Sequence, residues 1–120
     1  MAQTFTKNKL SGNTNGRSLK VTWTATGSAI TIHTAVSGTT NFDEIWVFAE
    51  NTSTSAVDLT IELWGTTSPD DTILVSIPPK SWPVLVVPWL LLNNWLLVKA
   101  FAATANVITI NWYVHNIVNS

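Results

Sequence analysis

The sequence predicts an all-β protein, folded as an antiparallel two-sheet sandwich of jelly-roll or immunoglobulin-like type with about eight strands. Three observations support this prediction. The apolar runs are short, they are bounded by proline, glycine and asparagine, and no window returns apolar residues at helical spacing. The chain has 120 residues, which is the size of one domain with one core.

Each expected strand follows from a local pattern of apolar and polar residues. Residues 57–63 alternate most regularly, so this strand should have one face in water. In residues 42–50, Ile45 and Val47 point to one side while Trp46 and Phe48 point to the other. A strand that is apolar on both faces is predicted to be central, with its second face covered by a loop or another subunit. The expected strands are residues 18–24, 30–33, 42–50, 57–63, 72–77, 84–87, 96–101 and 107–118.

The segment 72–117 holds most of the apolar runs and is expected to supply most of the core. Pro83 and Pro88 cannot donate hydrogen bonds to a ladder, which predicts an edge strand or one broken by bulges. Asn93 and Asn94 lie between two apolar runs, and asparagine tolerates positive φ. We therefore predict a two-residue type I′ hairpin over residues 90–101.

The first 17 residues mix polar residues with the single apolar residues Phe5 and Leu10, and they show no lasting period. The expected organisation is thus an N-terminal arm, residues 1–17, followed by a sandwich domain, residues 18–120. Two interpretations of the arm are open: a frayed terminus, or an extension that lies across a neighbouring subunit.

Charge is scarce: 11% of residues are charged, and the formal net charge is −1. Weak self-repulsion favours association with copies or with other proteins. The six basic residues are scattered, which argues against nucleic acid as a partner.

There is no cysteine, and the first residues lack the apolar segment of a signal peptide, so we expect synthesis in the cytosol. Residues 84–98 contain Pro88 and two asparagines, which disfavours a membrane span.

No motif for catalysis, cofactor binding or metal binding is present, so we expect a non-enzyme with no such site residues. Asp70 and Asp71 follow Ser68-Pro69 and fit a solvated loop tip better than a calcium site. His33 and His115 are isolated histidines without metal-site spacing, and each is expected on a solvated face or at an interface.

Seven tryptophans are several times the usual number for this length. Those inside expected strands, Trp23, Trp46 and Trp112, are interpreted as core or interface anchors. The other four, Trp64, Trp82, Trp89 and Trp95, flank turns where a small residue would be easier to place. Exposed tryptophan rings could alternatively stack on sugars.

Several short stretches in the second half of the sequence resemble small virion structural proteins of tailed bacteriophages, in particular head decoration or cement-type proteins with a β-sandwich fold. The matching stretches are Ser76-Ile77-Pro78-Pro79-Lys80-Ser81, Val87-Pro88, residues 99–108 and Tyr113-Val114-His115-Asn116-Ile117. Such sequences tend to have glycine where this chain has Trp82, Trp89, Trp95 and Trp112.

The resemblance implies a protein made in the host cytoplasm that binds the outer face of a capsid, contacts the major capsid protein and bridges neighbouring subunits. We also expect a homo-oligomer, most simply a trimer. The candidate interface residues are Phe5, Leu10, Trp46, Phe48, Trp82, Trp89 and Trp95. The alternatives are a neck, tail or fibre component, a carbohydrate-binding module, and a membrane-active β protein.

Overall fold

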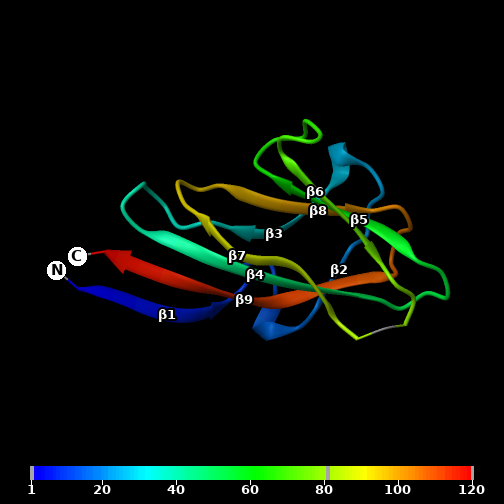
Figure 1. Ribbon diagram of the computed structural model, residues 1–120, viewed down its shortest axis with the longest axis horizontal. Helices are drawn as coiled ribbons and strands as arrows, with labels where there is room; N and C mark the ends of the chain where they lie inside the picture. The colour runs from blue at the N-terminus through cyan, green and yellow to red at the C-terminus, as the bar shows by residue number, and fades with distance from the viewer. Residues whose placement is uncertain (1, 81, 120) are drawn as a thin grey trace.

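The computed structural model describes residues 2–80 and 82–119 and shows a β-sandwich of two antiparallel sheets (Figure 1). Ser81, part of the motif quoted above, lies outside the described residues. Sheet A has the strand order β1-β9-β4-β7, with β2 also paired to β9, and sheet B has the order β3-β8-β5-β6. The strands are β1 (Gln3–Lys9), β2 (Leu19–Lys20), β3 (Ile30–Thr34), β4 (Phe42–Asn51), β5 (Val57–Leu63), β6 (Thr72–Ile77), β7 (Val84–Leu92), β8 (Leu97–Ala102) and β9 (Ile108–Asn119).

The predicted all-β sandwich is confirmed. The helical segments of the described chain are two three-residue 3-10 turns, Thr14–Gly16 and Thr26–Ser28. Within the described residues there are nine strands where about eight were expected, because residues 3–9 of the expected arm pair with β9 as β1. The expected strand over residues 18–24 is short, since only Leu19 and Lys20 pair with β9.

The core lies between the sheets and is filled by the alternating inward residues of both. In β4, Ile45 and Val47 are buried while Trp46 and Phe48 point to the other side, as the pattern predicted. β4 is also central, since it lies between β9 and β7. The fully buried side chains of largest volume are Leu10, Ile32, Ile45, Leu59, Ile61, Ile77, Ile108, Ile110, Val21, Val47, Val87 and Val98.

Strand β7 is an edge strand of sheet A, and its register against β4 shifts twice between Ile45 and Phe48. Pro88 lies in this irregular part of the strand and cannot donate to a ladder. Both consequences expected from the prolines, an edge position and a broken register, are therefore observed.

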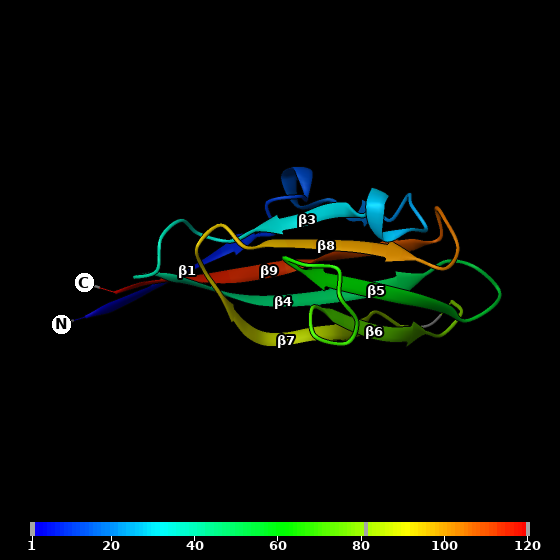
Figure 2. The ribbon, with the colours of Figure 1, turned by 90° about the horizontal axis from the view of Figure 1, so that it is seen from above.

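The predicted hairpin over residues 90–101 is wrong. β7 belongs to sheet A and β8 to sheet B, so the turn carries the chain from one sheet to the other (Figure 2). Positive φ occurs at Asn94 (55°) and Trp95 (63°), and Leu96 donates to the Asn93 carbonyl. The turn is thus of type I′ but lies one residue later than expected. The strands separate because both contribute residues to the core from opposite sides, and the turn instead bonds to the segment 36–38.

Candidate functional site

The outward side of sheet A carries a group of apolar side chains that spans four strands, and we call it the outer apolar face. Strand alternation and register place its members there: Tyr113 of β9 is opposite Trp46, Leu85 of β7 is opposite Phe48, and Leu91 is opposite Glu44. The members are Phe5, Phe42, Trp46, Phe48, Leu85, Trp89, Leu91, Trp112 and Tyr113. Phe5, Leu85, Trp89 and Leu91 are 41–62% exposed.

Trp46 lies at the centre of an aromatic cluster on this face. Its ring centroid is 5.5 Å from that of Trp89, 6.1 Å from Trp112 and 6.2 Å from Tyr113. Trp112 also stacks on Phe48, with an interplanar angle of 13°. Ring pairs in edge-to-face or offset contact hold one another in fixed orientations, so the cluster is an organised surface.

Two of these rings are presented by backbone that is unfavourable for tryptophan. Trp89 has φ 42° and Trp112 has φ 141°, in the region that favours glycine. Trp112 is in register with Val47, whose side chain is in the core, yet its ring stacks on Phe48 outside. The unusual φ at Trp112 therefore accompanies an aromatic ring placed on the outer apolar face.

Polar groups accompany the cluster. Trp46 Nε1 donates to Glu44 Oε1 at 3.1 Å, and His115 Nδ1 lies 3.1 Å from the same oxygen. The hydrogen bond with His115, followed by that from Trp46, lowers the pKa of Glu44. Lys7 Nζ lies 4.6 Å above the Tyr113 ring. Trp46 therefore has its indole nitrogen satisfied while its half-buried ring packs among the other aromatic rings.

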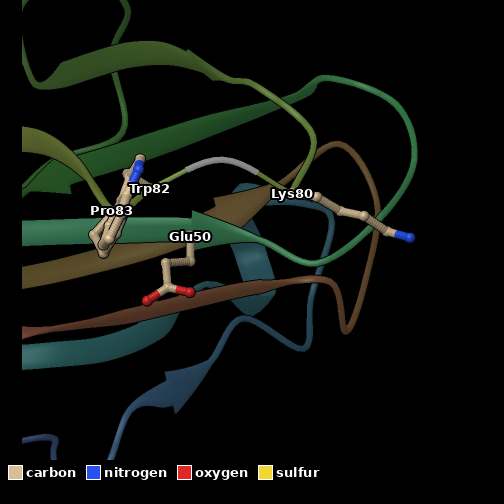
Figure 3. A pocket seen from close by; sticks show the side chains of 4 residues that line it. All are labelled: Glu50, Lys80, Trp82 and Pro83. Carbon is tan, nitrogen blue, oxygen red and sulfur yellow. The ribbon is translucent and has the colours of Figure 1, made fainter.

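Two adjoining depressions lie beside this face. The larger, about 520 Å³, is lined by Glu50, Lys80, Trp82 and Pro83 (Figure 3). The smaller shares Glu50 and Pro83 and reaches Phe48. In Figure 3 the Lys80 side chain extends away from Glu50 and Trp82. The charged groups of the depression thus do not converge as those of a catalytic pocket would.

The buried group of His33 and Asp43 has the residue types of an acid–base pair but not the required geometry. The Ser11 backbone N–H donates to His33 Nδ1 at 3.0 Å, so Nδ1 carries no proton, and Nε2 donates to Asp43 Oδ2 at 2.8 Å. The Ser11 hydroxyl accepts from the Thr34 N–H instead of bonding the ring. Both ring nitrogens are occupied and His33 is 4% exposed, so this group has a structural role.

The expectations for single polar residues need two corrections. His33 was expected on a solvated face or at an interface and is instead buried, because it bonds Asp43 across the sandwich. Glu62 was expected on the wet face of its strand and is 2% exposed, because Thr26 covers it and donates to its Oε2 atom. Covering segments and cross-sheet partners are far apart in the sequence, so the local pattern did not reveal them.

Four of the seven candidate interface residues lie on the outer apolar face: Trp46, Phe48 and Trp89 near the aromatic cluster, and Phe5 farther along the sheet. Leu10 is wrong as a surface candidate, since it is fully buried in the core. Trp82 lines the larger depression, and Trp95 lies in the turn between β7 and β8.

Sequence reasoning missed Leu85, Leu91 and Tyr113 as parts of a surface. The register expected for residues 90–101 paired Leu91 with Leu96 in a hairpin, although Leu91 lies opposite Glu44. Trp112 was interpreted only as a core or interface anchor. Its position before Tyr113, where resembling sequences have glycine, was the one available signal of unusual backbone.

Within residues 2–80 and 82–119, no group of three or more histidine, aspartate or glutamate side chains is placed to hold a metal ion. The described segments also contain no helix that is both long enough and apolar enough to span a bilayer. In comparisons with known proteins, no family model, curated protein or solved structure matched this chain.

Proposed function

We propose that this chain is a non-enzymatic virion structural protein, a capsid decoration or cement protein that binds the outer shell and bridges neighbouring capsid subunits. The observation that carries the proposal is the outer apolar face. Contiguous exposed apolar surface of more than a few hundred Å² is uncommon on soluble monomers and marks interaction sites. On this face Phe5, Leu85, Trp89 and Leu91 are each 41–62% exposed.

The backbone at Trp89 and Trp112 supports a binding role for this face. A non-glycine residue with positive φ costs about 1–2 kcal/mol. At Trp89 that cost accompanies a 62% exposed ring, which gains little from burial within one chain. Such a ring is stabilised when a partner covers it, and tryptophan is enriched among the residues that contribute most to interfaces.

The mechanism is adhesion. Desolvation of the aromatic cluster supplies binding free energy at about 25 cal/mol per Å² of apolar area. Lys7, His115 and Glu44 form a polar row across the face, between Phe5 and the aromatic cluster, and this row orients the contact. Many copies on a repetitive shell add multivalency, which raises the apparent affinity without new contacts. The resemblance of residues 72–118 to phage decoration proteins gives the class of partner, a shell of major capsid protein.

The test is co-sedimentation with assembled shells of tailed bacteriophages that lack their decoration proteins. Leu91→Glu places a charge on the outer apolar face, where the leucine is 54% exposed. Leu74→Glu is the matched control, because Leu74 lies on β6 of sheet B and is 67% exposed. We expect Leu91→Glu to weaken shell binding at least tenfold and Leu74→Glu to leave it unchanged. Equal binding by both variants, or no binding by the unmodified chain, contradicts the proposal.

A carbohydrate-binding module is the second candidate, and Trp82 is the observation that favours it. This ring is 87% exposed and lines the larger depression together with Glu50. An exposed ring beside a carboxylate can stack on a sugar and accept hydrogen bonds from its hydroxyls. Binding of the protein to a glycan array, abolished by Trp82→Ala and unaffected by Leu91→Glu, would favour this candidate over shell adhesion.

A further inference from the structure

The four outer edges of the two sheets differ in how well they are protected against pairing with another strand. β7 contains Pro88 and two register shifts against β4. β3 has a shift between Thr31 and His33. β6 pairs with β5 over six residues without a shift, but one of its residues is buried and three are half-buried. β1 pairs with β9 over seven residues without a shift and contains no proline. Proline, bulges, charged side chains and cover by other segments protect an edge; β1 has no proline and no bulge, and the charges of Lys7 and Lys9 are its protection.

Strand β1 is also uncovered on both faces. All seven of its residues are exposed, and its N-terminal end runs with the end of β9 beyond the strands of sheet B (Figure 2). In an antiparallel ladder, alternate residues turn their N–H and C=O groups toward the neighbouring strand. β9 forms hydrogen bonds with the backbone groups of one set of alternate β1 residues. The N–H and C=O groups of the other set face outward, where an extended strand can pair with them.

The sequence of β1 is suited to pairing with itself. When Gln3–Lys9 is laid antiparallel on a second copy with full overlap, Thr6 lies on the two-fold axis. Lys7 is then opposite Phe5 of the other copy, and Lys9 is opposite Gln3, so no two lysines are directly opposed. Threonine pairs stabilise antiparallel strands, whereas directly opposed like charges destabilise them. The charge pattern therefore fits a second copy of this chain.

From this regular, uncovered and self-complementary edge, we infer that β1 pairs antiparallel with β1 of a second copy, joining two sheets A into one continuous sheet. The contact is isologous, so it closes as a two-fold dimer, in contrast to the trimer expected from the sequence. The two outer apolar faces would then lie side by side on one sheet. This last step rests on the proposed function. The dimer would carry two shell-binding faces, and a protein that bridges neighbouring capsid subunits needs two.

The experiment is analytical ultracentrifugation of the full chain and two variants. Thr6→Lys and Thr6→Glu each place like charges opposite one another at the two-fold axis, at an exposed position. We expect the unmodified chain to be a dimer, each variant alone to raise the dimer dissociation constant at least tenfold, and an equimolar mixture of the two to restore a dimer. Thr31→Lys is the matched control, because Thr31 is an exposed threonine on the edge strand β3. It should leave the dimer unchanged.

A monomer or a trimer of the unmodified chain would overturn the inference, as would a dimer that both Thr6 variants retain. Shell binding separates this result from the proposed function. If the chain forms a β1 dimer but binds no shell, adhesion fails and the dimer stands. If Thr6→Lys still binds shells, with lower apparent affinity, adhesion stands and the dimer contributes avidity.

Discussion

The Nε2 atom of His33 donates a hydrogen bond to Oδ2 of Asp43 at 2.8 Å, and this bond joins strand β3 of sheet B to strand β4 of sheet A. Asp43 also accepts from the Val36 N–H and from Asn116 Nδ2 of β9. One buried carboxylate thus holds both sheets and the connection between β3 and β4. Burial raises the pKa of Asp43, but the hydrogen bonds from His33 and Asn116 outweigh it and lower the pKa below its ordinary value of 3.8.

Acid should weaken the fold through Asp43. Because its folded pKa lies below the unfolded value, the unfolded chain binds the proton first as the pH falls. The stability that Asp43 contributes is complete above the unfolded pKa, near 3.8, and is lost as the pH drops through the lower folded pKa. Urea unfolding at several pH values should show this loss as the pH falls below about 3.8, and Asp43→Asn should remove this part of the pH dependence.

Asp43→Asn should also lower the free energy of unfolding at pH 7 by about 1–3 kcal/mol, because the amide has no charge and one acceptor oxygen where the carboxylate accepts hydrogen bonds at two. Glu44→Gln is the adjacent control. Glu44 and His115 remain partly exposed, with 26% and 29% of their side-chain surface accessible, so this change should cost less than about 1 kcal/mol. Equal losses for the two variants would contradict the structural role given to Asp43.

Leu10→Ala should lower the free energy of unfolding by about 2–5 kcal/mol, since the leucine is fully buried and its truncation leaves a cavity. Phe5→Ala, at a 60% exposed position on β1, should change it by no more than about 0.5 kcal/mol. Chemical denaturation measures both. A negligible effect at Leu10 would mean that residues 1–17 are a dispensable arm.

The free energy of unfolding of Trp95→Gly should exceed that of Trp95→Ala by about 1 kcal/mol. Both substitutions remove the same ring, but only glycine accepts φ 63° without strain. The comparison of Trp95→Gly with Trp95→Ala by thermal unfolding isolates the backbone contribution. At Trp23, which is exposed and is not among the residues with positive φ, the order should reverse. The same order at both sites would refute the turn conformation.

The turn position can be tested at the two asparagines. Asn94 has φ 55°, so Asn94→Val should cost about 1–2 kcal/mol, while Asn94→Gly should be neutral or mildly stabilising. Asn93→Gly separates the two possible turns. If positive φ were needed at Asn93, glycine would be tolerated there as well; in the observed turn it should destabilise by about 0.5–1 kcal/mol. Melting temperatures of the three variants decide between these placements.

The elements that followed from the sequence are those set by local patterning. Strand β6 has the predicted bounds because its apolar run is enclosed by a loop and by Pro78-Pro79, and β5 because it alternates strictly. β1 was not foreseen, since all of its residues except Phe5 are polar and its strand conformation depends on β9, more than 100 residues later in the chain. Four members of the outer apolar face, Phe5, Trp46, Phe48 and Trp89, were among the predicted interface residues. A face as such was predicted only for the strand of Trp46 and Phe48, which has an unmistakable second apolar side.

The local sequence of the β7–β8 turn could not show that the two strands belong to different sheets. Two apolar runs joined by Asn93-Asn94 have the same local signature whether the strands pair or face each other across a core. Only the hydrogen bonds from Asn94 and Trp95 to the segment 36–38 distinguish the two cases, and these partners lie more than 50 residues earlier.

The position of β9 has a consequence for how the protein is made. β9 pairs with β1, β2 and β4, so three strands of sheet A find their neighbour in the strand that leaves the ribosome after the other eight. Until then, a nascent chain holds β4 with one side of its ladder open and β1 with no partner. Sheet A therefore assembles after translation of Ile108–Asn119, and a ribosome stalled before Ile108 carries exposed strand edges that are prone to aggregation.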